Sequence, residues 1–212
     1  MKTPRFYVYV SDAKLEMLHA QIPGKRRDRI ATELKLDLKL ISLSLSELPS
    51  EENRYSKLAV VTNYLESEGQ VGTIDVPNAY LRAKVVMTWG QPQSATETDD
   101  TVYFAADTGP LLVLLAGSPK HLVGGTAPSF DTPSGSLTPQ ILRSLRRFQR
   151  KDAAPDAESA AELVEHAVRW HVGADDTLEF LARRLLHDTG ARSGRKSKPI
   201  FLGSPVWVSL TD

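Results

Sequence analysis

We expect the fold to be built around the stretch 109–125, in which a run of five apolar residues, Leu111 to Leu115, stops abruptly at Ala116-Gly117-Ser118-Pro119. A short apolar run bounded by glycine and proline is typical of a buried strand rather than a helix. The residues after the run are small, so a ligand or another backbone segment can come close to the main chain there. We therefore expect a buried strand at 111–115 and a candidate site in the turn that follows it.

The clearest strand signal is the alternation of leucine with charged residues over 33–47. Leucine stands at 34, 36, 38 and 40 with Lys35, Asp37 and Lys39 between them, and the apolar parity then shifts at Ile41. Strict alternation favours a half-buried strand, and a shift of one residue favours a bulge near Leu40. Because one face would be wet, we expect antiparallel pairing in this region.

The remaining patterns complete an α/β or α+β fold. We expect further strands at 6–10, 71–76, 80–89, 102–105 and 200–210, and helices at 13–21, 53–68, 138–150, 158–171 and 176–188. The expected architecture is a single mixed β-sheet of about six or seven strands with helices packed on it. Since the last strand would return to this sheet after three helices, we expect one domain over residues 1–212.

Composition narrows the classes of function. The 26 basic and 26 acidic residues balance, so no global field favours nucleic acid or an anionic membrane. The absence of cysteine excludes disulfides, thiolate metal sites and a cysteine nucleophile. No signal-peptide core and no stretch of roughly 20 apolar residues is present, which predicts a cytoplasmic protein. The sequence contains no HExxH motif or comparable ligand spacing, so we expect no bound metal, and it contains no motif that would indicate a cofactor.

Three apolar segments break on small residues near a serine, at Ser11, Ser118 and Ser204. Ligands gather at the carboxyl ends of strands in open α/β sheets, where backbone N–H groups can hold anions. The candidate ligand-binding residues for a phosphate-containing small molecule are Ser11, Gly117, Ser118, Lys120 and Ser204. Compact turn chemistry of glycine and proline gives the same pattern, and neither GxxxxGK[ST] nor GxGxxG is present.

His121 is the histidine best placed for chemistry, because it stands on a glycine-flanked loop. If the strands before Asp12 and His121 are parallel neighbours, Asp12 could come within hydrogen-bond reach of His121, the candidate general base. A structural histidine is the alternative. The arginines of the helix expected at 138–150 could likewise bind an acidic partner or form a solvated face; they are Arg143, Arg146, Arg147 and Arg150.

The segments YVYVSDAKLEML, LLAGSPKHLVGG and FLGSPVWVSL together resemble an uncharacterised family of actinobacterial proteins. The resemblance spans nearly the whole chain. It implies a bacterial cytoplasmic origin, and it assigns no activity and no catalytic residue.

Three hypotheses for function follow. The first is a small-ligand or nucleotide-binding regulatory or sensor protein, in a bacterial signalling or defence pathway. The second is a hydrolase or transferase that uses His121 as general base, with Asp12 or Ser118 beside it. The third is an interaction module whose strand at 33–47 pairs with a protein partner or with a second copy in a homo-oligomer.

Overall fold

A computed structural model describes residues 5–41, 54–91, 101–124, 138–147, 159–192 and 195–211. Contacts divide the chain into two compact units. The barrel unit comprises residues 1–10 and 72–212, and the helical unit comprises residues 11–71. The expectation of one domain over 1–212 stays a prediction.

The main sheet of the described residues has seven strands: β1 (Phe6–Val10), β2 (Val71–Gly72), β3 (Tyr80–Gly90), β4 (Val102–Asp107), β5 (Leu112–Gly117), β6 (Ala174–Asp188) and β9 (Ile200–Leu210). A separate hairpin consists of β7 (Ala191–Arg192) and β8 (Arg195–Lys196). Strands β3, β4 and β5 form an antiparallel meander, and β5 runs parallel to β9. The sheet is therefore mixed, as the sequence predicts.

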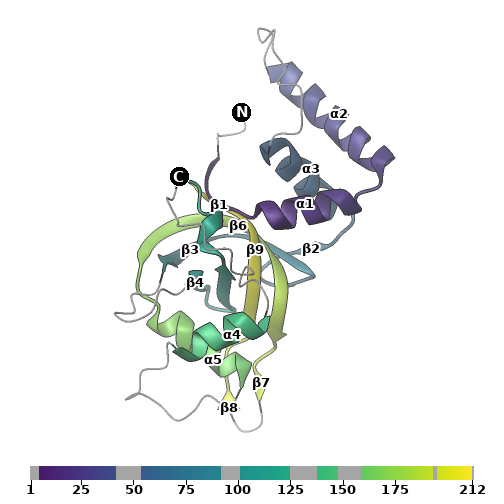
Figure 1. Cartoon of the computed structure of the whole chain (residues 1–212). Helices are drawn as coiled ribbons and strands as arrows, with labels where there is room; N and C mark the ends of the chain where they lie inside the picture. The colour runs from purple at the N-terminus through teal and green to yellow at the C-terminus, as the bar shows by residue number, and fades with distance from the viewer. Residues whose placement is uncertain are drawn as a thin grey trace. The chain divides into compact units, whose positions relative to one another are not determined.

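Five of these strands close into a ring, because β6 pairs with both β3 and β9 (Figure 1). The spatial order β6-β3-β4-β5 is that of a Greek key, in which the fourth strand returns beside the first. Strand β9 then closes the barrel between β5 and β6. Five-stranded Greek-key barrels include the OB-fold, and an architecture of this kind does not by itself assign a function.

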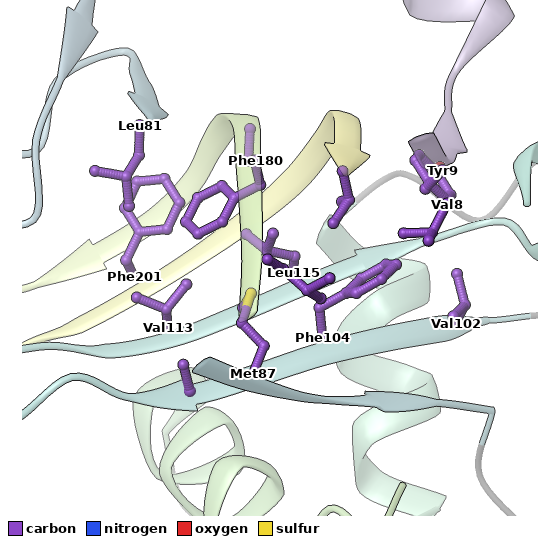
Figure 2. Packing of buried hydrophobic residues seen from close by; sticks show 14 of the residues in the cluster. Val8, Tyr9, Leu81, Met87, Val102, Phe104, Val113, Leu115, Phe180 and Phe201 are labelled. Carbon is purple, nitrogen blue, oxygen red and sulfur yellow. The ribbon is translucent and has the colours of Figure 1, made fainter. Parts of the chain in front are cut away.

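Two hydrophobic clusters bury opposite faces of the ring. Phe104, Leu115, Phe180 and Phe201 point into the interior, where Figure 2 shows their side chains together. The outward residues of β4, β5 and β9 pack instead against α4 (Thr138–Arg147) and α5 (Ala160–Trp170). Strand β5 is thus buried on both faces, which explains why its sequence is continuously apolar. The predicted buried strand at 111–115 is confirmed, with bounds of 112–117.

The helical unit contains α1 (Asp12–Gln21), α2 (Gly24–Ile41) and α3 (Arg54–Ser67). Ion pairs link these helices, with Arg26 bound to Glu68 and Lys57 bound to Glu16. The strand predicted over 33–47 is wrong for 33–41, which belong to α2; residues 42–47 lie outside the described residues. Leucine, lysine, glutamate and alanine are strong helix formers, and this propensity outweighs the alternation here.

The helix predicted over 176–188 is also wrong, because this segment is the long strand β6. Its composition of leucine, alanine, arginine and glutamate favours a helix. Leu178, Phe180 and Ala182 nevertheless lie two apart and all enter the barrel interior, so pairing with β3 and β9 decides the conformation.

Other boundaries differ less. The strand expected at 71–76 is reduced to β2, because residues 73–76 form a turn in which Thr73 N–H donates to the Val76 carbonyl. Helix α5 starts at a capping box formed by Ser159 and Glu162. Residues 124–138 are rich in glycine, serine, threonine and proline, which predicts a long irregular loop, and they fall almost entirely outside the described residues. None of the helices in the described ranges is long and apolar enough to cross a lipid bilayer.

Candidate functional site

Strand β9 changes its partner along one edge. Its first residues, Ile200 to Gly203, pair with β5, and its last residues, Trp207 to Leu210, pair with β1. Residues 204–206 lie between these two pairings. The candidate residue Gly117 is the last residue of β5, Ser118 and His121 follow it, and Ser204 occupies the middle of β9. We call this region the strand junction and include Tyr9 of β1 in it.

Gly117 is in direct contact with Tyr9 at the strand junction. A Cβ atom added at Gly117 would overlap the Tyr9 hydroxyl oxygen, so no larger residue fits without movement. Tyr9 is fully buried. The main chain after Leu122 also turns back to β1, because Val123 N–H donates to the Val8 carbonyl at 2.9 Å. The close approach expected after the buried strand is therefore made by another part of this chain.

His121 ends the short 3₁₀ turn η1 (Pro119–His121) and is only 5% exposed. Its ring meets the Tyr9 ring edge-on, with centroids 5.8 Å apart. Tyr9 in turn contacts Phe104, and Phe104 stacks on Trp89. His121 thus ends a line of aromatic rings that runs through the barrel interior. Burial and edge-on packing are features of a structural histidine, which the sequence offered as the alternative.

The candidate serines at the junction are buried, and the candidate lysine is exposed. Ser118 precedes η1, and its hydroxyl makes no capping hydrogen bond. Ser204 is 1% exposed, and among the described residues its hydroxyl has no hydrogen-bond partner. Gly203 faces the interior residues Leu115 and Ala182, so the alternation of the strand turns Ser204 to the outer face. Lys120 stands exposed on η1.

Ser11 and Asp12 belong to the helical unit. The Ser11 hydroxyl accepts a hydrogen bond from Lys14 Nζ at 3.3 Å. Asp12 begins α1, and its carboxylate pairs with Arg54 Nε at 2.7 Å. The Asp12 charge is thus already balanced by an arginine. Contact between Asp12 and His121 stays a prediction.

Helix α4 is amphipathic, as the sequence predicts. Ile141 and Leu145 are buried against the sheet, while Arg143 and Arg146 are exposed. The side chain of Arg147 and all of Arg150 lie outside the description. Within the described residues, no group of three or more histidine, aspartate or glutamate side chains could hold a metal ion.

Sequence reasoning found the glycine and serines of the junction but not Tyr9. Tyr9 belongs to a strand more than 100 positions earlier, and only the pairing of β1 with β9 brings it to Gly117. The glycine itself is a sequence signal, since a glycine at a strand end often marks close approach by another group. It does not say which group approaches.

A family model described as "Family of unknown function (DUF7019)" matches residues 5–212. This match agrees with the expectation of an uncharacterised family, while the actinobacterial origin stays a prediction. No curated protein and no solved structure matches the chain. The family description names no activity, so the case for a function rests on the residues of the site.

Proposed function

The chain belongs to this family of unknown function, and we propose that it is a small-ligand-binding protein of a regulatory or sensor kind. The ligand carries a phosphate group and binds at the strand junction. The observation that carries the proposal is the Ser204 hydroxyl, which is buried and has no hydrogen-bond partner among the described residues. Buried polar groups are nearly always satisfied, so an unsatisfied one calls for a functional explanation.

The neighbouring groups suit a phosphate. A phosphate accepts hydrogen bonds from hydroxyl groups and gains most from a nearby cation. Ser204 and Ser118 supply hydroxyl donors, and Lys120 supplies a positive charge on the same turn as His121. Nucleotides and phosphorylated metabolites are the ligands of this chemistry.

Binding is better supported than catalysis at this site. A general base must come within hydrogen-bond reach of the proton that it removes. His121 is buried and packed against Tyr9, which does not support access by a substrate. The hydrolase or transferase alternative therefore has less support than the binding proposal.

An interaction module remains the second candidate, on different evidence. The strand at 33–47 cannot supply a sheet edge over residues 33–41, because these residues are helical. Trp170 and Val172 are 66% and 85% exposed where α5 meets β6. Exposed large apolar side chains favour a protein partner or a second copy. Size-exclusion chromatography with light scattering, repeated on Trp170→Ser, tests self-association through this place.

The test of the binding proposal is a thermal-shift screen against nucleotides and phosphorylated metabolites. A ligand at 100 times its Kd stabilises the folded chain by about 2.7 kcal/mol, so a true ligand raises Tm clearly. Ser204→Ala and Lys120→Ala should reduce the shift, and Ser204→Ala should leave the ligand-free Tm nearly unchanged. Arg143→Ala on α4 is the control for lost charge. No stabilising phosphate compound, or equal losses in all three variants, would refute the proposal.

A regulatory role in a bacterial signalling or defence pathway, and a cytoplasmic location, stay part of the proposal. Identification of the ligand would test the regulatory role more directly than any feature of the fold.

A further inference from the structure

A second polar cluster lies on the outer face of the barrel unit, where two arginines share one carboxylate. Arg82 donates to Glu179 Oε1 from Nε at 2.8 Å and from Nη2 at 2.6 Å. Arg5 Nη2 lies 3.0 Å from Glu179 Oε2. The three residues come from β3, β6 and the residue before β1. Two positive charges therefore meet one negative charge.

The guanidinium groups are held by an aromatic ring as well as by the carboxylate. Arg5 and Arg82 lie over the ring of Trp207, with their Cζ atoms 5.1 and 5.7 Å from its centroid. Trp207 is itself fixed by an edge-on contact with Tyr7 and is fully buried. Cation–π attraction stabilises such positions independently of a carboxylate. Both guanidinium groups would thus keep their contact with the Trp207 ring if the ion pairs with Glu179 were broken.

The charges around Glu179 are predominantly positive. Lys84 stands directly opposite Glu179 in the pairing of β3 with β6, and its side chain is exposed. Arg5, Arg82 and Lys84 therefore surround a single acidic residue, in a chain whose formal charge is zero. The side chains of Arg5 and Arg82 are 36% and 29% exposed, against 16% for Glu179. The arginines are reached from solvent more readily than the carboxylate between them.

We propose that Arg5 and Arg82 form a binding site for a phosphate dianion, with Glu179 as an internal competitor. The ligand is inorganic phosphate or the phosphomonoester of a small molecule. A carboxylate brings one negative charge to this place, whereas a phosphate near neutral pH brings close to two and has three acceptor oxygens. Arginine forks match these oxygens in pairs. The site does not depend on the strand junction, which shares none of these residues.

Because Glu179 and phosphate would compete for Arg5 and Arg82, removal of the Glu179 charge should strengthen phosphate binding. Glu179→Gln keeps the size and a hydrogen-bond acceptor but removes the competing charge, so it should tighten the binding of inorganic phosphate by about tenfold. A purely structural carboxylate gives the opposite result, because its loss weakens the cluster and creates no site. Isothermal titration calorimetry at constant ionic strength, with chloride replaced by phosphate, measures the difference.

Matched variants separate the site from general charge effects. Adding Arg82→Gln or Arg5→Gln to Glu179→Gln should reverse the gain by about tenfold. Arg183→Gln is the control, because Arg183 is an exposed arginine of the same strand as Glu179. It should change the affinity less than about twofold. Ser204→Ala and Lys120→Ala should leave this binding unchanged, which separates it from binding at the junction.

Phosphoserine and a mononucleotide extend the titration to phosphomonoesters. If only inorganic phosphate binds, the ligand of the site is the free ion. If an ester also binds, the ligands include phosphorylated small metabolites. If Glu179→Gln does not fold by circular dichroism, Arg82→Lys in the otherwise unchanged chain replaces it. Arg82→Lys keeps the charge and loses the fork, so it should weaken phosphate binding several-fold. Equal affinity in Glu179→Gln and in the Arg82 double variant, or in Arg82→Lys and the unchanged chain, overturns the proposal.

Discussion

His171 shows how burial of one side chain can make the stability of the fold depend on pH. It follows α5, and its ring packs edge-on against Tyr103 of β4 with centroids 6.1 Å apart. Its Nε2 atom is buried and has no hydrogen-bond partner among the described residues. Burial lowers the pKa of His171 below its ordinary value of 6.5, because the charged form is poorly solvated there.

Stability should therefore fall as the solution is made acidic. Well above pH 6.5 His171 is neutral in both states, whereas at lower pH the unfolded chain binds the proton more readily than the folded chain. Urea unfolding at pH 7.5 and 5.0 should show a loss that His171→Phe reduces. Asp107 does not interfere, since its pKa is lowered from 3.8, chiefly by the hydrogen bond from Lys198. An identical pH dependence in His171→Phe would contradict the assignment.

Sequence predicts single residues only where their surroundings are local. Gly117 and Ser118 mark a strand end in any arrangement, and both were found as candidates. Tyr9, which contacts Gly117, comes from a strand 108 positions earlier along the chain, and no local signal points to it. For the same reason Arg5, Arg82 and Glu179 carry no common signal in the sequence. Only the closed ring brings them to one place.

At the level of helices and strands, periodicity succeeded where it agreed with propensity. Strands β4, β5 and β9 are rich in residues that favour strands, and helix α4 has a clear apolar stripe. In α2 and β6 the two signals disagree, and a different one prevails in each. Among the described residues no strand pairs with the alternating segment in α2, whereas β6 has a strand on each side. Pairing at long range thus determined both outcomes.

Two adjacent residues of β3 test the orientation of the strand. Met87 is fully buried inside the barrel, and Val86 is 64% exposed on the outside. Met87→Ala should lower the free energy of unfolding by about 2–5 kcal/mol, because it leaves a cavity. Val86→Ala should cost less than about 1 kcal/mol, which reflects strand propensity alone. Equal costs in urea melts would show that β3 does not alternate between interior and solvent.

For the whole molecule, β9 is the element on which the most pairings depend. It pairs with β1, β5 and β6, and its residues 200–209 are all buried. Deletion of residues 199–212 should therefore abolish soluble folded protein, as judged by a thermal melt and by one-dimensional NMR. A truncated chain that keeps a cooperative transition of the helical unit alone would show two independent domains. A melt close to that of the intact chain would contradict the closed barrel.

The closure of the ring by β9 also sets the order of events during synthesis. The other four strands of the ring are synthesised before β9, and β1 precedes β9 by about two hundred residues. Until β9 arrives, β5 and β6 each lack a neighbour on one edge, and unpaired strand edges promote aggregation. Contacts so distant in sequence also slow folding. We therefore expect the nascent chain to bind a chaperone, which would protect the open edges of β5 and β6 until β9 is made.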